Sequence, residues 1–312
     1  MVSIEEIRQA AARVRPIARL TPMIDATLIA GRPLFLKCES LQPAGAFKIR
    51  GAYNMVAQLT DEQRRRGVVT FSSGNHGQAM ALAARELGAP AVVVMPTTAP
   101  SIKIEGARGF GAEVIFAGTT SVERRKRAEE EAAARGLTMV PPFDHEWIIA
   151  GQGTLGLEIL EQCPDVETVL VPVGGGGLLA GVAAAIKQTR PGVRVIGVEP
   201  TGAAKMKASL EAGHAVTLSK TESVADGLMP VRPGDITFAH AQKFVDSVVT
   251  VDDEQIIDAM LWLMTSAKIV AEPSGAATVA AALNGAAQGL TVAIISGGNV
   301  GLDRLEELRK SR

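Results

Sequence analysis

One lysine in this chain is placed for covalent chemistry. Lys48 follows the turn-forming run Pro43-Ala44-Gly45 and stands directly before a helical pattern. Lysines are usually solvated surface charges, and Lys48 taken alone fits that ordinary interpretation. In a dry pocket, however, burial would lower its pKa and leave a neutral amine available as nucleophile and base.

A run of four glycines supplies the second chemical feature. Gly174–Gly177 follows the apolar segment 169–173 and leads into a helical pattern that starts at Leu178. Glycines let the backbone approach a phosphate closely, and the helix N-terminus adds a positive end. The alternative is a flexible turn. An amine and a phosphate cradle in one chain suggest pyridoxal phosphate, which has an aldehyde at one end and a phosphate at the other.

The same glycines also fit a dinucleotide site. Gly175-x-Gly177-x-x-Ala180 matches the dinucleotide fingerprint, and Glu199 stands at the end of the next predicted strand, where a ribose-binding acid is expected. An NAD-dependent oxidoreductase is therefore a second hypothesis. The glycine run alone does not decide between the two cofactors, and a non-catalytic small-molecule-binding module is a third, more distant hypothesis.

Two further loops favour pyridoxal phosphate. The segment 72–77 joins a predicted strand to a helix and concentrates two hydroxyls and an amide, which suits a substrate carboxylate. Helix capping by Ser72 or Ser73 is the alternative, and it explains one serine but not the cluster. Ser296 ends another predicted strand, where it could bond the pyridine nitrogen of a cofactor or simply belong to a turn.

Short apolar segments alternate with helical patterns and must position these loops. We predict strands at 67–71, 91–95, 113–116, 168–173, 194–199 and 291–296, and helices at 75–87, 101–109, 121–134, 178–187 and 255–268. Ser121 is expected to cap its helix and Gly136 to follow its end. Thr60 and Gln63 match a capping box. The alternation predicts a parallel α/β fold, with ligands at the carboxyl ends of the strands.

Four segments together resemble the fold type II pyridoxal-phosphate enzymes, and within them the serine/threonine dehydratases (threonine ammonia-lyases) and serine racemases. The segments are 45–52, 72–78, 174–178 and 296–299. The similarity extends from about Thr21 to Asn299 and includes 149–154 and 225–228. Each piece alone is common, whereas the combination is highly specific.

The resemblance implies an α/β fold like that of the tryptophan synthase β subunit, with two open, twisted, mostly parallel sheets flanked by helices. It implies a discontinuous large cofactor-binding domain of residues 1–59 and 139–312, and a small substrate-loop domain of residues 60–138. It also implies a homodimer.

The resemblance assigns roles to individual residues. Lys48 would bind the cofactor aldehyde and then act as the base on the substrate. The residues implied to hold the cofactor are Phe47, Lys48, Asn75, Gly174, Gly175, Gly176, Gly177, Leu178 and Ser296, and those implied to surround the substrate carboxylate are Ser72, Ser73, Asn75 and His76. The implied reaction turns L-threonine or L-serine into the 2-oxo acid and ammonia. Glu272 is expected near the cofactor without a defined role.

Two positions bear on the branch within this family. In racemase-like members the serine that matches Ser73 is the acid/base on the face opposite the lysine, so a two-base serine racemase is the close alternative to a dehydratase. Racemase-like members often bind a divalent cation through Glu-Pro-x-x-Ala-x-Asp, but here Lys205 takes the place of the aspartate after Glu199. We predict no metal, with Lys205 either paired to Glu199 or pointing into solvent.

Composition agrees with a cofactor enzyme of this size. The chain has 312 residues, 47% hydrophobic content, 4% aromatics and a net charge of -1. Neither nucleic acid nor anionic membrane has a general electrostatic reason to bind it. Two cysteines and the absence of a signal-peptide pattern lead us to expect a cytoplasmic location. Because the chain ends soon after Ser296, we also expect no isoleucine feedback through an added C-terminal domain.

Overall fold

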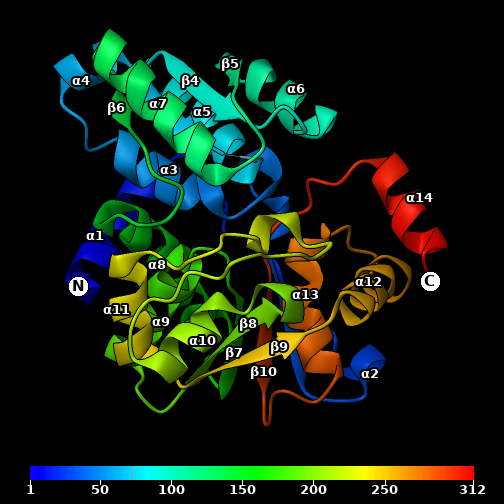
Figure 1. Ribbon diagram of the computed structural model, residues 1–312. Coiled ribbons are helices and arrows are strands. Elements are labelled where there is room, and N and C mark those ends of the chain that lie inside the picture. Colours follow the sequence, from blue (N-terminus) through cyan, green and yellow to red (C-terminus); the bar gives the residue numbers. More distant parts are fainter. Residues whose placement is uncertain (73) are drawn as a thin grey trace.

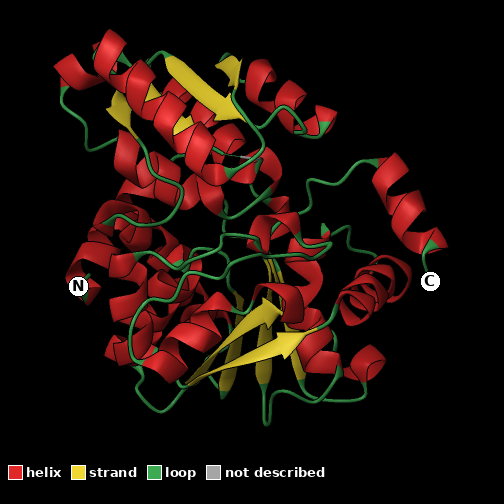
Figure 2. Ribbon diagram, viewed as in Figure 1, coloured by secondary structure: helices red, strands yellow, loops and turns green. Residues whose placement is uncertain are grey.

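The larger of two sheets, together with the helices around it, contains most of the chain. The computed structural model describes residues 1–72 and 74–312. Six strands lie in the order β1-β2-β10-β7-β8-β9, and all neighbours are parallel except β1 with β2. Figure 2 shows this sheet as the lower group of arrows. Its strands are β1 Met23–Asp25, β2 Leu34–Cys38, β7 Thr168–Pro172, β8 Arg194–Pro200, β9 Ser247–Val251 and β10 Thr291–Ile295.

The helices around this sheet come from residues 4–56 and 146–310. The parallel strands force long crossovers, which the helices supply. They are α1 Ile4–Val14, α2 Thr27–Ala30, α3 Lys48–Val56, α8 Glu146–Gln162, α9 Gly177–Thr189, α10 Lys205–Ala212, α11 Asp235–Phe244, α12 Asp253–Trp262, α13 Pro273–Leu283 and α14 Leu302–Lys310. Short helical turns occur at Glu39–Leu41, Pro43–Gly45, Thr201–Ala203 and Asp226–Leu228, and a π-helical turn at Leu263–Ala267 follows α12.

The smaller sheet lies above the larger one in Figure 1. Its strands are all parallel, in the order β5-β4-β3-β6, with bounds β3 Val68–Phe71, β4 Ala91–Met95, β5 Glu113–Phe116 and β6 Thr138–Met139. The helices between them are α4 Asp61–Arg66, α5 Asn75–Glu86, α6 Ser101–Gly109 and α7 Ser121–Arg135. These strands fall in residues 68–139, near the predicted small domain, whose boundaries at 60 and 138 stay a prediction.

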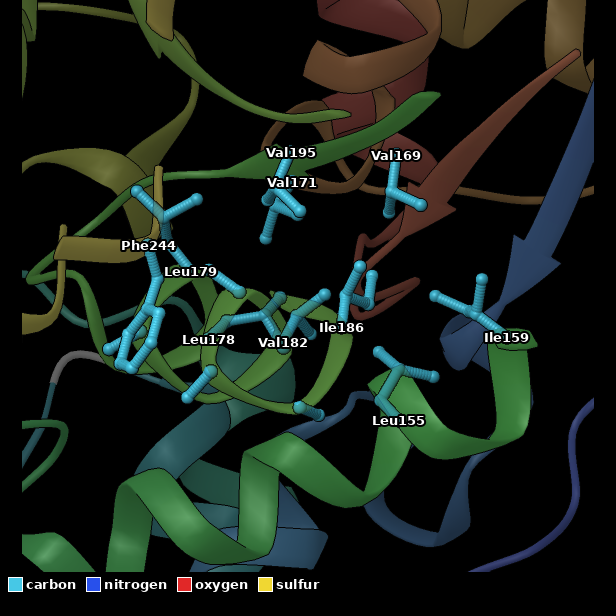
Figure 3. Close-up of a cluster of buried hydrophobic side chains, with 14 of the residues drawn as sticks. Leu155, Ile159, Val169, Val171, Leu178, Leu179, Val182, Ile186, Val195 and Phe244 are labelled. Carbon is cyan, nitrogen blue, oxygen red and sulfur yellow. The ribbon is translucent and has the colours of Figure 1, made fainter. Parts of the chain in front are cut away.

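Alternating side chains cover both faces of the larger sheet. Val169 and Val171 of β7 face α8 and α9, where Leu155, Leu179 and Val182 pack against them (Figure 3). Leu170, between the two valines, joins a second cluster with α12 and α13. Strands buried on both faces read as continuous apolar runs, which explains why the sequence revealed these strands.

Helix α8 was not among the predicted helices, and its glycines explain why. Gly151, Gly153 and Gly156 lower helix propensity. Packing requires them, because a Cβ at Gly151 would lie 2.6 Å from the Arg50 carbonyl oxygen, and one at Gly156 would lie 2.8 Å from Ala185 Cβ. The glycines thus bring α3 and α9 close to α8, and tertiary contacts outweigh local propensity.

Most local signals were correct at the helix ends, with one exception. Thr60 and Gln63 form the predicted capping box, and Gly136 ends α7 in the left-handed conformation at φ 65°. The cap of α7 is Thr120 rather than Ser121, since the Thr120 hydroxyl accepts a hydrogen bond from the Glu123 amide. A capping box that includes Glu123 therefore places the cap one residue earlier than predicted, while the helix itself starts at Ser121 as predicted.

A buried ionic network fastens the start of α3. The Arg50 guanidinium donates to both oxygens of Glu39 at 2.7 and 2.9 Å and to both oxygens of Glu158 at 2.7 and 2.8 Å. The Lys37 ammonium donates to Glu158 at 2.8 Å. Two cations thus face two carboxylates where β2, α3 and α8 meet, two residues beyond Lys48.

The helices of residues 1–72 and 74–312 include none that is both long and apolar enough to span a lipid bilayer.

Candidate active site

Lys48 begins helix α3 with its amine turned toward the segment after β6. Its Nζ donates to the Pro142 carbonyl oxygen at 2.6 Å and lies 5.2 Å from the centre of the Phe47 ring. Burial lowers the pKa of Lys48 to about 8. A neutral amine is therefore accessible near neutral pH, as the nucleophilic role requires.

The turn before Lys48 is joined to the loop after β10. Phe47 N–H donates to the Ser296 carbonyl at 3.0 Å, and Gly298 N–H donates to the Gly45 carbonyl at 2.9 Å. The Asn299 side chain donates to the Ala44 carbonyl at 2.8 Å and holds Ala44 at a positive φ of 64°. Such a conformation is uncommon for alanine and costs free energy, so the hydrogen bond from Asn299 helps to stabilise the turn that precedes Lys48.

Ser296 is buried beside this junction. Its exposed fraction is 4%, and its hydroxyl makes only a long 3.4 Å bond to the Ser274 carbonyl. The hydroxyl is therefore weakly engaged and can turn to another partner.

Asn75 starts α5 and reaches across to the larger sheet's loops. Its amide nitrogen donates to Glu272, and its amide oxygen accepts from Asn299 at 3.0 Å. Glu272 stands directly before α13 and is 2% exposed. Asn75, Ser296 and the turn before Lys48 thus meet at one place, although Ser296 lies far along the chain from the other two.

The remaining residues of the 72–77 loop have different environments. The Ser72 hydroxyl accepts from Gly74 N–H at 3.1 Å, and Gly74 is the N-cap of α5 without a side-chain cap, so Ser72 does not cap the helix. His76 is buried, its Nε2 lies 3.1 Å from the Val140 carbonyl, and burial together with the Lys48 charge lowers its pKa to about 3. The predictions for Ser73 lie outside the described residues.

The glycine run has the geometry of a cradle. Gly176 has φ 98°, which favours glycine, and a Cβ at Gly175 would lie 2.3 Å from the Phe143 ring. Within the described part of the chain, the Gly174, Gly175 and Gly176 amides donate to no group. Because α9 begins at Gly177, these free N–H groups adjoin a positive helix end. The glycine run is therefore better explained as a phosphate-binding loop than as a flexible turn.

A segment that the sequence analysis missed links the cradle to Lys48. Pro142 accepts from Lys48, and the next residue, Phe143, lies against Gly175 and Gly177. The Thr237 hydroxyl donates to the Gly175 carbonyl at 2.7 Å and supports the loop from α11. The run Pro141-Pro142-Phe143 after a strand was an available signal for a fixed loop.

Lys205 is paired rather than solvated. Its buried ammonium lies 3.1 Å from Glu199 and donates to the carbonyls of Val173, Ala203 and Leu228 at 2.7, 3.1 and 2.9 Å. The predicted alternative of a lysine pointing into solvent was wrong, because β8, α10 and the loop before Gly174 enclose the side chain. The described residues contain no group of three or more His, Cys, Asp or Glu side chains suited to a metal ion.

The pKa of Lys48 leads to a direct prediction. An amine-selective reagent should label Lys48 of the cofactor-free protein with a midpoint at about pH 8, because the neutral amine reacts and becomes the main form above that pH. Ordinary lysines titrate near ~10.4. Peptide mass spectrometry across a pH series measures this, with exposed Lys126 as the internal reference; a Lys48 midpoint near that of ordinary lysines would contradict the burial argument.

Comparisons with known proteins identify the family. Residues 14–297 match the family described as pyridoxal-phosphate dependent enzyme. The chain is 45% identical to the L-threonine ammonia-lyase of Thermotoga maritima, over 99% of this chain and 78% of that protein. It is 42% identical to the serine racemase of Oryza sativa subsp. indica, over 97% of this chain and 93% of that protein.

A solved structure agrees with these relatives. Maize serine racemase matches with a TM-score of 0.94 and 40% identity, covering 99% of this chain and 97% of that one. These relatives make pyridoxal phosphate the cofactor of the family, and the NAD hypothesis finds no support in these comparisons. The expectation of a fold type II enzyme is confirmed. The chain belongs to the family of pyridoxal-phosphate dependent enzymes, in the group of threonine/serine dehydratases and serine racemases.

Proposed function

We propose that this enzyme dehydrates and deaminates L-threonine or L-serine to the 2-oxo acid and ammonia. The observation that carries the proposal is the buried Lys48 amine, whose pKa is lowered to about 8 and whose Nζ donates to Pro142, the residue before the Phe143 ring that lies against Gly175. The cytoplasmic location and the homodimer stay predictions that accompany this proposal.

The proposed cofactor contacts follow the sequence prediction. The free amides of Gly174–Gly177 and the Leu178 amide would hold the phosphate, Phe47 would flank the ring, and Asn75 would contact the ring hydroxyl. When bound, pyridoxal phosphate withdraws electrons from the substrate α-carbon and makes its proton more acidic. The Lys48 amine, once free, would remove that proton and then hold it near the departing β-hydroxyl.

Substrate binding is assigned to the start of α5. The loop residues Ser72 and Ser73 and the first turn with Asn75 and His76 would receive the substrate carboxylate, because helix N-terminal amides attract anions. His76 carries no positive charge near neutral pH, since burial lowers its pKa to about 3. Its contribution would therefore be shape and hydrogen bonding rather than charge.

Ser296 would favour elimination over transamination. A neutral hydroxyl bonds the pyridine nitrogen without holding it protonated, whereas a carboxylate would stabilise the positive ring. The weak bond of Ser296 to Ser274, at 3.4 Å, supports this role because it leaves the hydroxyl available.

The reaction is tested by oxo-acid release from L-threonine. Holoenzyme should release 2-oxobutanoate and ammonia in equal amounts, and Lys48→Ala should lower kcat by at least about a hundredfold, the lower end of a general base's contribution. Lys126→Ala, on an exposed face of α7, is the matched control. Full turnover by Lys48→Ala would refute the assignment of Lys48.

Serine racemisation is the second candidate function. Ser73 stands where racemase-like members carry their second acid/base, and serine racemases are among the relatives of this chain. If Lys48 and Ser73 act on opposite faces, Ser73→Ala should lose D-serine formation from L-serine while it retains pyruvate release. Chiral chromatography and a pyruvate assay measure the two products, and equal loss of both would contradict a two-face mechanism.

We also propose that Lys205 removes the need for a divalent cation near Glu199. The Glu199 carboxylate already accepts from the Met206 and Lys207 amides at 2.9 Å each, and the Lys205 ammonium completes its partners. Turnover should therefore be unchanged by EDTA, and Lys205→Met should destabilise the fold by about 3–5 kcal/mol because it leaves a buried carboxylate unpaired. Loss of turnover in EDTA that magnesium restores would overturn this proposal.

A further inference from the structure

Lys103 of α6 is a buried lysine that the proposed function does not use. Its side chain is 5% exposed, and its Nζ lies 2.5 Å from Asp226 Oδ2 and 3.5 Å from Glu272 Oε2. Asp226 belongs to the turn Asp226–Leu228, and Glu272 precedes α13. The lysine comes from the elements around the smaller sheet, whereas both carboxylates come from those around the larger sheet.

The Glu272 carboxylate connects this ion pair to Asn75. Its Oε1 accepts from the Asn75 amide, while Oε2 faces the Lys103 ammonium and has no hydrogen-bond partner within the described part of the chain. A Cβ at Gly297 would lie 2.4 Å from Glu272 Oε1, so the carboxylate lies directly against the loop after Ser296. The orientation of the Asn75 amide therefore depends on where Glu272 is held.

The path of the Lys103 side chain explains why a glycine stands at position 74. A Cβ at Gly74 would lie 2.4 Å from Lys103 Cδ and 3.0 Å from its Nζ. The lysine thus crosses the backbone immediately before Asn75, and the absence of a side chain at Gly74 makes that route open. Lys103 therefore contacts the backbone at Gly74, directly before α5. It is also linked to the Asn75 side chain through Glu272.

Charge keeps the cluster together. Burial raises the pKa of Glu272, and the Lys103 ammonium opposes that rise. Burial alone would lower the pKa of Lys103, but Glu272 and then Asp226 outweigh it and raise that pKa. Without Lys103, a buried carboxylate would face Asp226 with no cation between them, and Glu272 would favour its protonated form.

We propose that Lys103 is a positioning residue, which bridges the two sheets' elements through Asp226 and Glu272 and so fixes the Glu272 carboxylate that orients the Asn75 amide. This inference rests on the proposed function, which assigns Asn75 to the cofactor and substrate. Lys103 itself is given no contact with either, and its effect passes through Glu272.

The test is a double-mutant cycle of Lys103→Met and Glu272→Gln in the holoenzyme. Hydrogen exchange at residues 75–78 should accelerate at least about fivefold in each single variant and little further in the double, because the effects of residues in contact are not additive. Additive effects, or unchanged exchange in Lys103→Met, would overturn the proposal. This readout does not require turnover, so it separates the proposal from failure of the proposed reaction.

Control variants separate positioning from general destabilisation. Lys220→Met removes a lysine from a fully solvated pair with Glu222 and should change nothing. Lys103→Arg keeps the charge and should restore most of the exchange protection. For oxo-acid release, Lys103→Met should raise KM more than it lowers kcat; an equal loss in Lys103→Arg and Lys103→Met would contradict a charge-dependent role.

Discussion

The site depends on the paired charges around Arg50. This guanidinium has no solvent access, and it binds two carboxylates, Glu39 after β2 and Glu158 in α8. Breaking such a buried pair costs about 3–5 kcal/mol, because the remaining charge stays buried without compensation. Since Arg50 lies in the first turn of α3, the network fixes the direction from which Lys48 enters the site. The backbone at Lys48 is thus held by the paired Arg50 two residues away, and the Lys48 amine bonds the Pro142 carbonyl.

A second constraint is the close approach of backbones. Glycines of α8 let α3 and α9 pack tightly, and the amides of Gly174, Gly175 and Gly176 donate to no group among the described residues, while Gly175 and Gly177 let Phe143 approach. Both sets permit contacts that a methyl group would block. Lys48 contacts Pro142, and the next residue, Phe143, lies against Gly175 and Gly177 because these glycines have no side chain. Both the packing of α8 and the proposed phosphate-binding loop thus require glycines.

The sequence predicted the parts with local signals well. Apolar runs such as 91–95 and 168–173 are strands because they are buried on both faces, and the caps at Thr60 and Gly136 follow from side-chain chemistry. Helix α8 was missed because packing outweighs its low helix propensity, and the cap of α7 was placed one residue late because Thr120 and Glu123 form the capping box. The Arg50 network, Phe143 and Lys103 depend on contacts between distant segments, which no local pattern contains.

Lys48 is proposed to be the amine that binds pyridoxal phosphate. This proposal is tested most directly by reducing the purified holoenzyme with borohydride and mapping the modified peptide by mass spectrometry. Reduction should remove the yellow colour and leave a pyridoxyl group on Lys48 alone. A modified lysine elsewhere, such as Lys103 or Lys205, would contradict it.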